Sequence, residues 1–188
     1  MNTSSHPHVG FLGRASAGKD TAAEALVGQG YRRAAFADEI RSACLAVDPI
    51  VTVDGHRLST VVTAYGWDDA KRIYSEVRRV MQQIGQCHLR VDPDVWIRPV
   101  TSLLDDQAGP VVVTDVRYPA EVAALRARGA LLIYIQRPGV VDGPHSSESS
   151  VHPADADVVL TNGSSRADLW HSVREAVLGA ALSRAESG

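Results

Sequence analysis

The chain has 188 residues, 45% of them apolar and 22% charged, and its formal net charge at pH 7 is −3. This length suits a single domain with a sizeable core, and the composition excludes a disordered chain. The slightly acidic balance argues against general binding to a nucleic-acid polymer or an anionic membrane. Any anion site must therefore be a local cluster of basic residues.

The two cysteines and the start of the chain bear on its location. Cys44 and Cys87 have neither metal-ligand spacing nor the pattern of a disulfide framework, which favours a reducing compartment. Residues 1–8 are polar and lack the apolar stretch of a secretion signal, and no segment approaches the roughly 20 apolar residues that span a bilayer. We therefore expect a cytoplasmic protein with no membrane partner.

A glycine-bounded loop follows the first predicted strand, residues 9–12. Residues 13–21 read Gly-Arg-Ala-Ser-Ala-Gly-Lys-Asp-Thr, and the alanine-rich residues 22–27 predict a helix after them. This is the strand–loop–helix context that the phosphate-binding pattern G-x-x-x-x-G-K requires. Glycines let the backbone wrap around phosphate oxygens, amides at the helix N-terminus attract the anion, and the lysine adds a mobile charge. The sequence predicts a P-loop; the alternative is a glycine-rich turn that caps a helix.

The residue after the lysine departs from the usual P-loop. Ser or Thr commonly stands there as a magnesium ligand, whereas this chain has Asp20 and places Thr21 one position later. Asp20 either caps the helix or orders the water around the metal.

The middle of the chain predicts helices. In order, the pattern predicts a strand over residues 31–36, a helix over 39–47 capped by Asp38, a hairpin or turn at 51–55, a helix from 58 broken at Gly66, a short helix over 68–73, an amphipathic helix from 75 to about 85 or a turn further, and a helix around 96–104.

The second half alternates strands and helices again. The predicted strands are residues 110–115, 131–135 and 158–160, the predicted helices are 120–128 and 166–184, and residues 137–157 are expected to form a mobile loop. Alternation of this kind predicts an α/β fold of three layers, with a mostly parallel sheet and helices on both faces.

Polar residues follow each predicted strand, where ligands bind in open parallel sheets. Beyond the P-loop, these are Asp38, Arg41, Asp115, Arg117, Arg137, Thr161, Asn162 and Gly163. Lys19 and the three arginines would converge on one edge, which suits a substrate with several phosphates.

Three of these residues have a structural interpretation beside the functional one. Asp115 is a candidate magnesium ligand or a turn cap. Arg117 could bind an acceptor phosphate or be solvated. Arg137, at the start of the flexible segment, could meet the transferring phosphoryl group or form a surface ion pair.

Several other polar and aromatic side chains are weaker candidates. Arg78 and Arg79 are adjacent on one helix, so only one can face a ligand, and the same holds for Gln82 and Gln83. Residues 145–148, His-Ser-Ser-Glu, give only weak evidence for a hydrolase triad because no oriented acid partner is identified. The three tryptophans are expected to pack in or near the core.

The motifs together resemble the P-loop nucleoside monophosphate kinases; in the adenylate kinases of this group, a threonine two places after the lysine is normal. The sequence is more closely similar to the deoxynucleoside monophosphate kinases of bacteriophages. The stretches that carry this resemblance are Gly18-Lys19-Asp20-Thr21, residues 36–41 (Phe-Ala-Asp-Glu-Ile-Arg), 66–71 (Gly-Trp-Asp-Asp-Ala-Lys), 76–85 (Glu-Val-Arg-Arg-Val-Met-Gln-Gln-Ile-Gly), 114–121 (Thr-Asp-Val-Arg-Tyr-Pro-Ala-Glu) and 145–148.

The resemblance implies a single P-loop kinase domain over residues 1–188, with a helical nucleotide-monophosphate-binding insertion at about 37–95 and a short lid at about 137–152. It implies ATP as donor, Mg²⁺ as cofactor, a deoxynucleoside monophosphate (dNMP) as acceptor, and host cytoplasm as the location if a phage encodes the chain. Gln86-Cys87 stands where relatives often carry Thr-Glu. A homodimer is compatible with the sequence, which indicates no oligomeric state.

The resulting site assignments fall into four groups. Expected to bind ATP are Gly13, Ala15, Ser16, Ala17, Gly18, Lys19, Asp20, Thr21, Asn162 and Gly163. Expected to bind the dNMP are Phe36, Asp38, Arg41, Arg79, Gln83, Arg117 and Glu148. Expected to hold magnesium are Thr21 and Asp115, and expected to act in catalysis are Lys19, Arg137 and Asp115.

Two alternatives stay open at this point. One is a P-loop kinase of another small phosphorylated acceptor, such as dephospho-coenzyme A or phosphomevalonate. The other is an ATP-binding switch or assembly protein without kinase activity, against which the several arginines speak.

Overall fold

The computed structural model describes residues 6–106, 108–139 and 150–186, without the side chains of residues 88–90. The chain forms two compact units. The first consists of Met1–Ala35 and Val100–Gly188, and the second is the continuous stretch Phe36–Pro99. The predicted insertion at about 37–95 falls within the second unit, and its role in binding stays a prediction.

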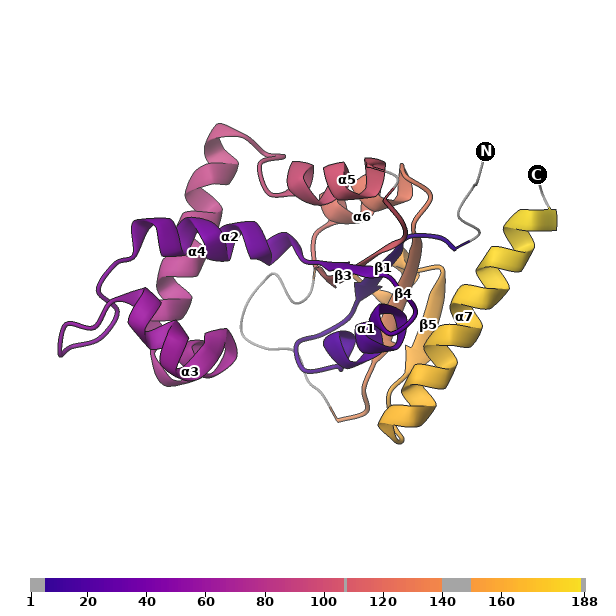
Figure 1. Cartoon of the computed structure of the whole chain (residues 1–188), viewed down its shortest axis with the longest axis horizontal. Coiled ribbons are helices and arrows are strands. Elements are labelled where there is room, and N and C mark those ends of the chain that lie inside the picture. Colours follow the sequence, from indigo (N-terminus) through magenta and orange to yellow (C-terminus); the bar gives the residue numbers. More distant parts are fainter. Residues whose placement is uncertain (1–5, 107, 140–149, 187–188) are drawn as a thin grey trace. The chain divides into compact units, whose positions relative to one another are not determined.

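A five-stranded sheet forms the centre of the first unit (Figure 1). Its strands, in spatial order, are β2 (Arg32–Ala34), β3 (Val111–Val116), β1 (Val9–Leu12), β4 (Leu131–Gln136) and β5 (Val158–Thr161). Each neighbouring pair is parallel. The central strands are continuously apolar because both of their faces are covered, which confirms the predicted α/β class.

Helices cover the sheet on both faces, which makes three layers. α1 (Lys19–Val27) and α7 (Arg166–Glu186) bury Leu26 and Val173 against Phe11 and Ile133 on one face. On the other face, α6 (Pro119–Arg126) packs so closely that a Cβ on Gly10 would lie 2.8 Å from Leu125 Cδ1. α5 (Ile97–Asp105) lies beside α6 in Figure 1. A short 3₁₀ turn, η2 (Pro153–Asp155), precedes β5.

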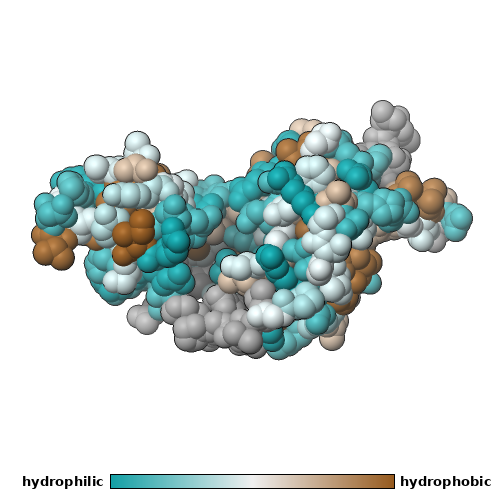
Figure 2. Space-filling view, turned by 90° about the horizontal axis from the view of Figure 1, so that it is seen from below, coloured by the Kyte–Doolittle hydropathy of each residue, from teal (hydrophilic) through white to brown (hydrophobic). Residues whose placement is uncertain are grey.

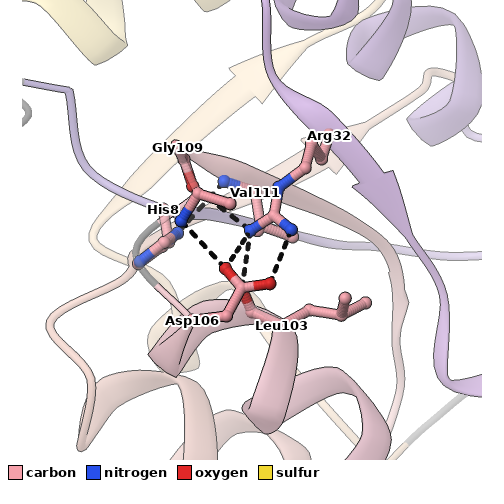
Figure 3. A network of polar contacts seen from close by, with 7 residues as sticks. His8, Arg32, Leu103, Asp106, Gly109 and Val111 are labelled. Carbon is pink, nitrogen blue, oxygen red and sulfur yellow. Dashed lines mark hydrogen bonds and ion pairs between the residues drawn. The ribbon is translucent and has the colours of Figure 1, made fainter.

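A polar network joins the edge of the sheet at which the strands begin (Figure 3). The guanidinium of Arg32 binds both carboxylate oxygens of Asp106, at 2.7 and 2.8 Å, and donates to the carbonyl of Leu103 at 2.7 Å. His8 Nδ1 accepts the backbone N–H of Val111 at 3.0 Å. Burial, and then the charge of Arg32, lowers the pKa of His8, so its ring stays a neutral acceptor. This network lies opposite the carboxyl edge.

The second unit contains three helices, α2 (Phe36–Val47), α3 (Leu58–Ile73) and α4 (Ser75–Val91). Its core is the buried set Cys44, Val51, Leu58, Val61, Ala70, Val77 and Val80. Gly66 interrupts α3 with φ 71°, a left-handed conformation that glycine adopts without steric cost, so the predicted break is confirmed. The predicted turn before α3 is confirmed as well, with Gly55 at φ 88°.

Several predicted element boundaries differ from the structure, among them the strand predicted over residues 31–36, which spans only Arg32–Ala34. α1 begins at Lys19 rather than residue 22, because the helix starts directly at the P-loop. α2 begins at Phe36 rather than residue 39, so Asp38 lies inside its first turn, where the helix dipole also favours acidic side chains. α4 passes through Gly85 and ends at Val91, slightly beyond the predicted end around Gly85 or a turn further, and Ile40 of α2 lies 3.5 Å from where a Cβ on Gly85 would be.

The surface is mainly hydrophilic on the face that Figure 2 shows, with apolar residues in small separate groups. The large apolar side chains that are exposed come from many elements and include Val53, Tyr65, Val159 and Leu182. Among the described residues, no helix combines the length and the apolar character that a membrane crossing needs.

Candidate active site at the carboxyl edge of the sheet

The loop between β1 and α1 has glycines at the two positions where a side chain would clash. Gly13 has φ 133°, and a Cβ there would lie 2.4 Å from the carbonyl oxygen of Ile135 in β4. Gly18 has φ 100°, and its Cβ would lie 2.4 Å from Asn162 Nδ2. At the crest of the loop, Ser16 also has a positive φ of 61°. The loop is therefore wound tightly against the ends of β4 and β5.

Lys19 folds back over this loop. Its side chain is 8% exposed, and Nζ donates to the carbonyls of Gly13 and Arg14, each at 2.7 Å. Two carbonyls thus hold the ammonium group against the loop whose amides precede α1. A lysine in this place can transfer its hydrogen bonds from the carbonyls to phosphate oxygens.

Two further predicted residues meet the same loop from the ends of neighbouring strands. Asn162, directly after β5, donates from Nδ2 to the carbonyl of Ala17 at 2.8 Å. Arg137, directly after β4, donates from its guanidinium to the carbonyl of Ser16 at 3.4 Å. The structure therefore brings Lys19, Arg137 and Asn162 together around one loop, as the sequence predicted; their contact with ATP stays a prediction.

The first turn of α1 is held by α7. The indole nitrogen of Trp170 donates to the carbonyl of Thr21 at 2.7 Å. The guanidinium carbon of Arg166 lies 4.5 Å from the centroid of the Trp170 ring, and Arg166 also pairs with Glu24 of α1 at 2.7 Å. These contacts fix the backbone at Thr21, a predicted magnesium ligand.

Asp20 lies beside Thr21 in the first turn of α1. Its carboxylate is 81% exposed and 3.8 Å from the guanidinium of Arg33 in β2. A carboxylate in the first turn interacts favourably with the helix dipole, and the choice between the structural and the magnesium-water interpretation of Asp20 stays a prediction.

Asp115 lies next to a β-bulge in β3. The pairing of β1 with β3 runs Val9 to Val112 and Gly10 to Val113, and resumes at Leu12 to Val116. Two residues of β3, Thr114 and Asp115, therefore oppose one residue of β1. Bulges bend a strand and redirect its side chains, and here Thr114 is buried while Asp115 is half-buried.

Glu121 is a buried acid that the sequence did not predict as a site residue. It lies in the first turn of α6, is 7% exposed, and accepts the backbone N–H groups of Arg117 at 2.6 Å and Tyr118 at 3.1 Å through Oε2. Burial raises the pKa of Glu121 to about 7, and the nearby charge of Asp115 raises it further, against the opposite effect of the Arg117 amide. The signal in the sequence was a proline two residues before a glutamate at a helix start.

The other predicted acceptor residues of the described chain lie in the second unit and make local contacts. On α2, Phe36 is 3% exposed, and Arg41 donates to Asp38 Oδ1 at 3.0 Å while its guanidinium lies 5.9 Å from the centroid of Trp67. On α4, Arg79 donates to Gln83 Oε1 at 2.6 Å.

Two predictions remain, one on residues outside the described chain and one within it. Glu148 and residues 145–148, with most of the predicted lid, lie outside the described residues. The tryptophans do pack as expected: Trp96 is 8% exposed and donates to the carbonyl of Gly85 at 3.1 Å, and Trp67 packs against the core of the second unit.

The fold and the wound loop with its buried lysine define a P-loop protein. A solved dephospho-CoA kinase from Campylobacter jejuni has the same fold, with a TM-score of 0.51 and 14% sequence identity over 94% of this chain and 98% of that one.

A family model described as deoxynucleotide monophosphate kinase matches residues 56–173, more than half of the chain, and the chain belongs to this family. It is therefore an enzyme that transfers phosphoryl groups. A putative deoxynucleotide monophosphate kinase of Acanthamoeba polyphaga mimivirus is 24% identical over 184 residues, which cover 88% of this chain and 93% of the relative. An uncharacterized protein of Ictalurid herpesvirus 1, ORF76, is 34% identical over 84 residues, covering 43% and 35% of the two chains.

Proposed function

We propose that the enzyme transfers the γ-phosphoryl group of ATP to a dNMP. An oxygen of the acceptor phosphate forms a bond to the γ-phosphorus of ATP, the bond from that phosphorus to the β–γ bridging oxygen breaks, and the products are ADP and the deoxynucleoside diphosphate. The chemistry needs positioning and charge neutralisation, and no covalent intermediate with the protein.

The observation that carries this proposal is the position of Lys19. Its ammonium group rests on the carbonyls of Gly13 and Arg14 at 2.7 Å, inside a loop that also receives contacts from Arg137 and Asn162. Two positive side chains and the amides at the start of α1 thus surround one small region. This is the charge distribution that a triphosphate with a transferring γ-group requires.

The donor roles follow from these contacts. Lys19 and the loop, Gly13, Ala15, Ser16, Ala17, Gly18, Asp20 and Thr21, would hold the β- and γ-phosphates, and Arg137 would neutralise the transferring group. Asn162 fixes the loop through Ala17 and, with Gly163, would flank the adenine.

Thr21 and Asp115 would hold Mg²⁺, directly or through water. The described residues contain no group of three His, Cys, Asp or Glu side chains that could form a metal cage. A hydroxyl and one half-buried carboxylate fit this ion, which typically takes one or two protein oxygens together with phosphate oxygens and water. When bound, Mg²⁺ would neutralise charge on the β- and γ-phosphates.

The acceptor roles rest on arginines. Arg117 follows the strand that ends in Asp115, and its exposed guanidinium is available to bind the acceptor phosphate through two parallel hydrogen bonds. Arg41 and Arg79 would add positive charge to this phosphate. Further dNMP contacts are proposed for Phe36, Asp38, Gln83 and Glu148.

A coupled assay of ADP release with ATP, Mg²⁺ and each common dNMP tests the proposal, with ribonucleotides and dephospho-coenzyme A as further acceptors. Lys19→Met, which keeps the side-chain length without the charge, should lower kcat by about a hundredfold or more. Arg184→Met is the matched control, since Arg184 donates to the carbonyl of Gly129 near the start of β4. ADP release that does not depend on any dNMP would overturn the proposal.

A further inference from the structure

Glu121 is an ionisable side chain buried under an exposed segment. Residues 117–120, between the end of β3 and the first turn of α6, are all exposed, whereas the side chain of Glu121 is 7% exposed. One carboxylate oxygen accepts two consecutive backbone N–H groups, from Arg117 at 2.6 Å and from Tyr118 at 3.1 Å. The segment is thus held from its buried side.

A helix cap alone does not require this arrangement. Glu121 is the N3 residue of α6, and its bond to the N–H of the N-cap residue Tyr118 belongs to a capping box, although the Tyr118 side chain itself makes no capping bond. The bond to the Arg117 amide and the burial of the carboxylate go beyond such a cap. A solvated Ser, Thr, Asp or Asn at that position caps a helix without the desolvation of a carboxylate. The chain uses such a cap at α7, where exposed Asp168 accepts the N–H of Ser165 and Ser165 Oγ accepts that of Asp168, each at 3.2 Å. The carboxylate at α6 is buried instead.

The two hydrogen bonds fix the backbone on both sides of the Arg117 α-carbon. One goes to the amide of Arg117 itself and the other to the amide of the next residue. The Arg117 side chain therefore extends from a backbone position that is held in place, just after the bulge that contains Asp115. A bidentate contact to a phosphate depends on such orientation.

We propose that Glu121 is the positioning residue of the acceptor phosphate site: it holds the Arg117–Tyr118 backbone so that Arg117 can bind the phosphate. This inference rests on the proposed function. It assigns Glu121 no contact with substrate.

Three variants test it in the dNMP kinase assay. Glu121→Gln keeps an oxygen that can accept both N–H groups, whereas Glu121→Met keeps the length of the side chain without an acceptor. Asp157→Ala is the control, because Asp157 Oδ2 accepts the backbone N–H of Leu132 at 2.8 Å near the start of β4, at the opposite edge of the sheet. Thermal unfolding of each variant separates kinetic effects from lost protein.

We expect Glu121→Met to raise KM for the dNMP about tenfold or more and to leave KM for ATP within about twofold. Glu121→Gln should keep both values close to wild type, and so should Asp157→Ala. In the background of Arg117→Ala, Glu121→Met should add no more than about a twofold increase, because the two residues act through one contact.

Other outcomes would overturn the inference. If the effects of Glu121→Met and Arg117→Ala multiply, or if both KM values rise together, Glu121 only stabilises α6. A wild-type enzyme without activity on any dNMP defeats the proposed function and this inference with it, whereas an active enzyme with multiplying effects defeats the inference alone. Should Glu121→Met fail to fold, hydrogen exchange in the wild type decides: the amides of Arg117 and Tyr118 must be protected, and fast exchange at both refutes the role.

Discussion

Replacing Glu121 by glutamine should change how the stability of the enzyme depends on pH. Burial raises the pKa of Glu121 from an ordinary 4.5 to about 7, with the charge of Asp115 acting in the same direction and that of Arg117 against it. Folding therefore favours the protonated carboxyl. The contribution of Glu121 to stability is fully present below pH 4.5 and is lost as the pH rises through 7.

The size of the effect follows from the shift. One pKa unit corresponds to about 1.4 kcal/mol, so the rise of Glu121 corresponds to about 3 kcal/mol at alkaline pH. Between pH 5 and pH 8, the free energy of unfolding of the wild type should fall by roughly 2.5 kcal/mol relative to Glu121→Gln, which cannot ionise.

Urea unfolding followed by circular dichroism at several pH values measures this difference. Glu121→Met is the control, because it also lacks a titrating group and should show the same slope as Glu121→Gln with a different offset. Parallel pH profiles for wild type and Glu121→Gln would refute the reasoning, since the carboxyl would then ionise alike in the folded and unfolded chains.

Three further predictions address other contacts. Gly13→Ala should lower the free energy of unfolding by about 2 kcal/mol or more and weaken ATP binding, because its Cβ would lie 2.4 Å from the carbonyl oxygen of Ile135; calorimetry that finds normal affinity would contradict this. Trp170→Phe should cost about 1 kcal/mol in urea unfolding, since the bond to the carbonyl of Thr21 is lost, and an unchanged midpoint would speak against that bond. The lowered pKa of His8 means that its stabilising effect is present above about pH 6.5 and is lost as the pH falls. His8→Asn, which keeps an acceptor, should remove that loss. If the free energy of unfolding of wild type and His8→Asn falls identically at acid pH, the prediction is wrong.

The sequence was sufficient to predict most of the fold. Continuous apolar runs such as residues 131–135 identified parallel strands, because only a strand covered on both faces lacks polar alternation. Gly66 was identified as a break in a helix, and its φ of 71° explains why glycine stands there. The predicted P-loop has the winding that Gly13 and Gly18 permit.

Features that depend on packing could not be predicted. The helix predicted to end around Gly85 or a turn later runs on to Val91, and Ile40 of α2 packs beside Gly85. The bulge at Thr114 and Asp115 depends on the register with β1, which a single strand does not encode.

The burial of a carboxyl side chain could not be predicted from the sequence either. The sequence analysis assigned Glu121 no role, since a glutamate in the first turn of a helix is ordinary. Only the three-dimensional structure shows that this side chain turns inward to the amides of Arg117 and Tyr118.

The division of the chain into a continuous second unit and a split first unit has a kinetic consequence. β1 pairs with β3, and the bond from Val111 to His8 joins residues 103 positions apart. During synthesis, the stretch Phe36–Pro99 is complete before β3 exists. Its helices depend on local contacts, which form quickly, whereas the sheet must close a long loop. Early folding of the second unit would shorten that loop. Until β3 has been synthesised, β1 and the P-loop have no partner strand to pair with.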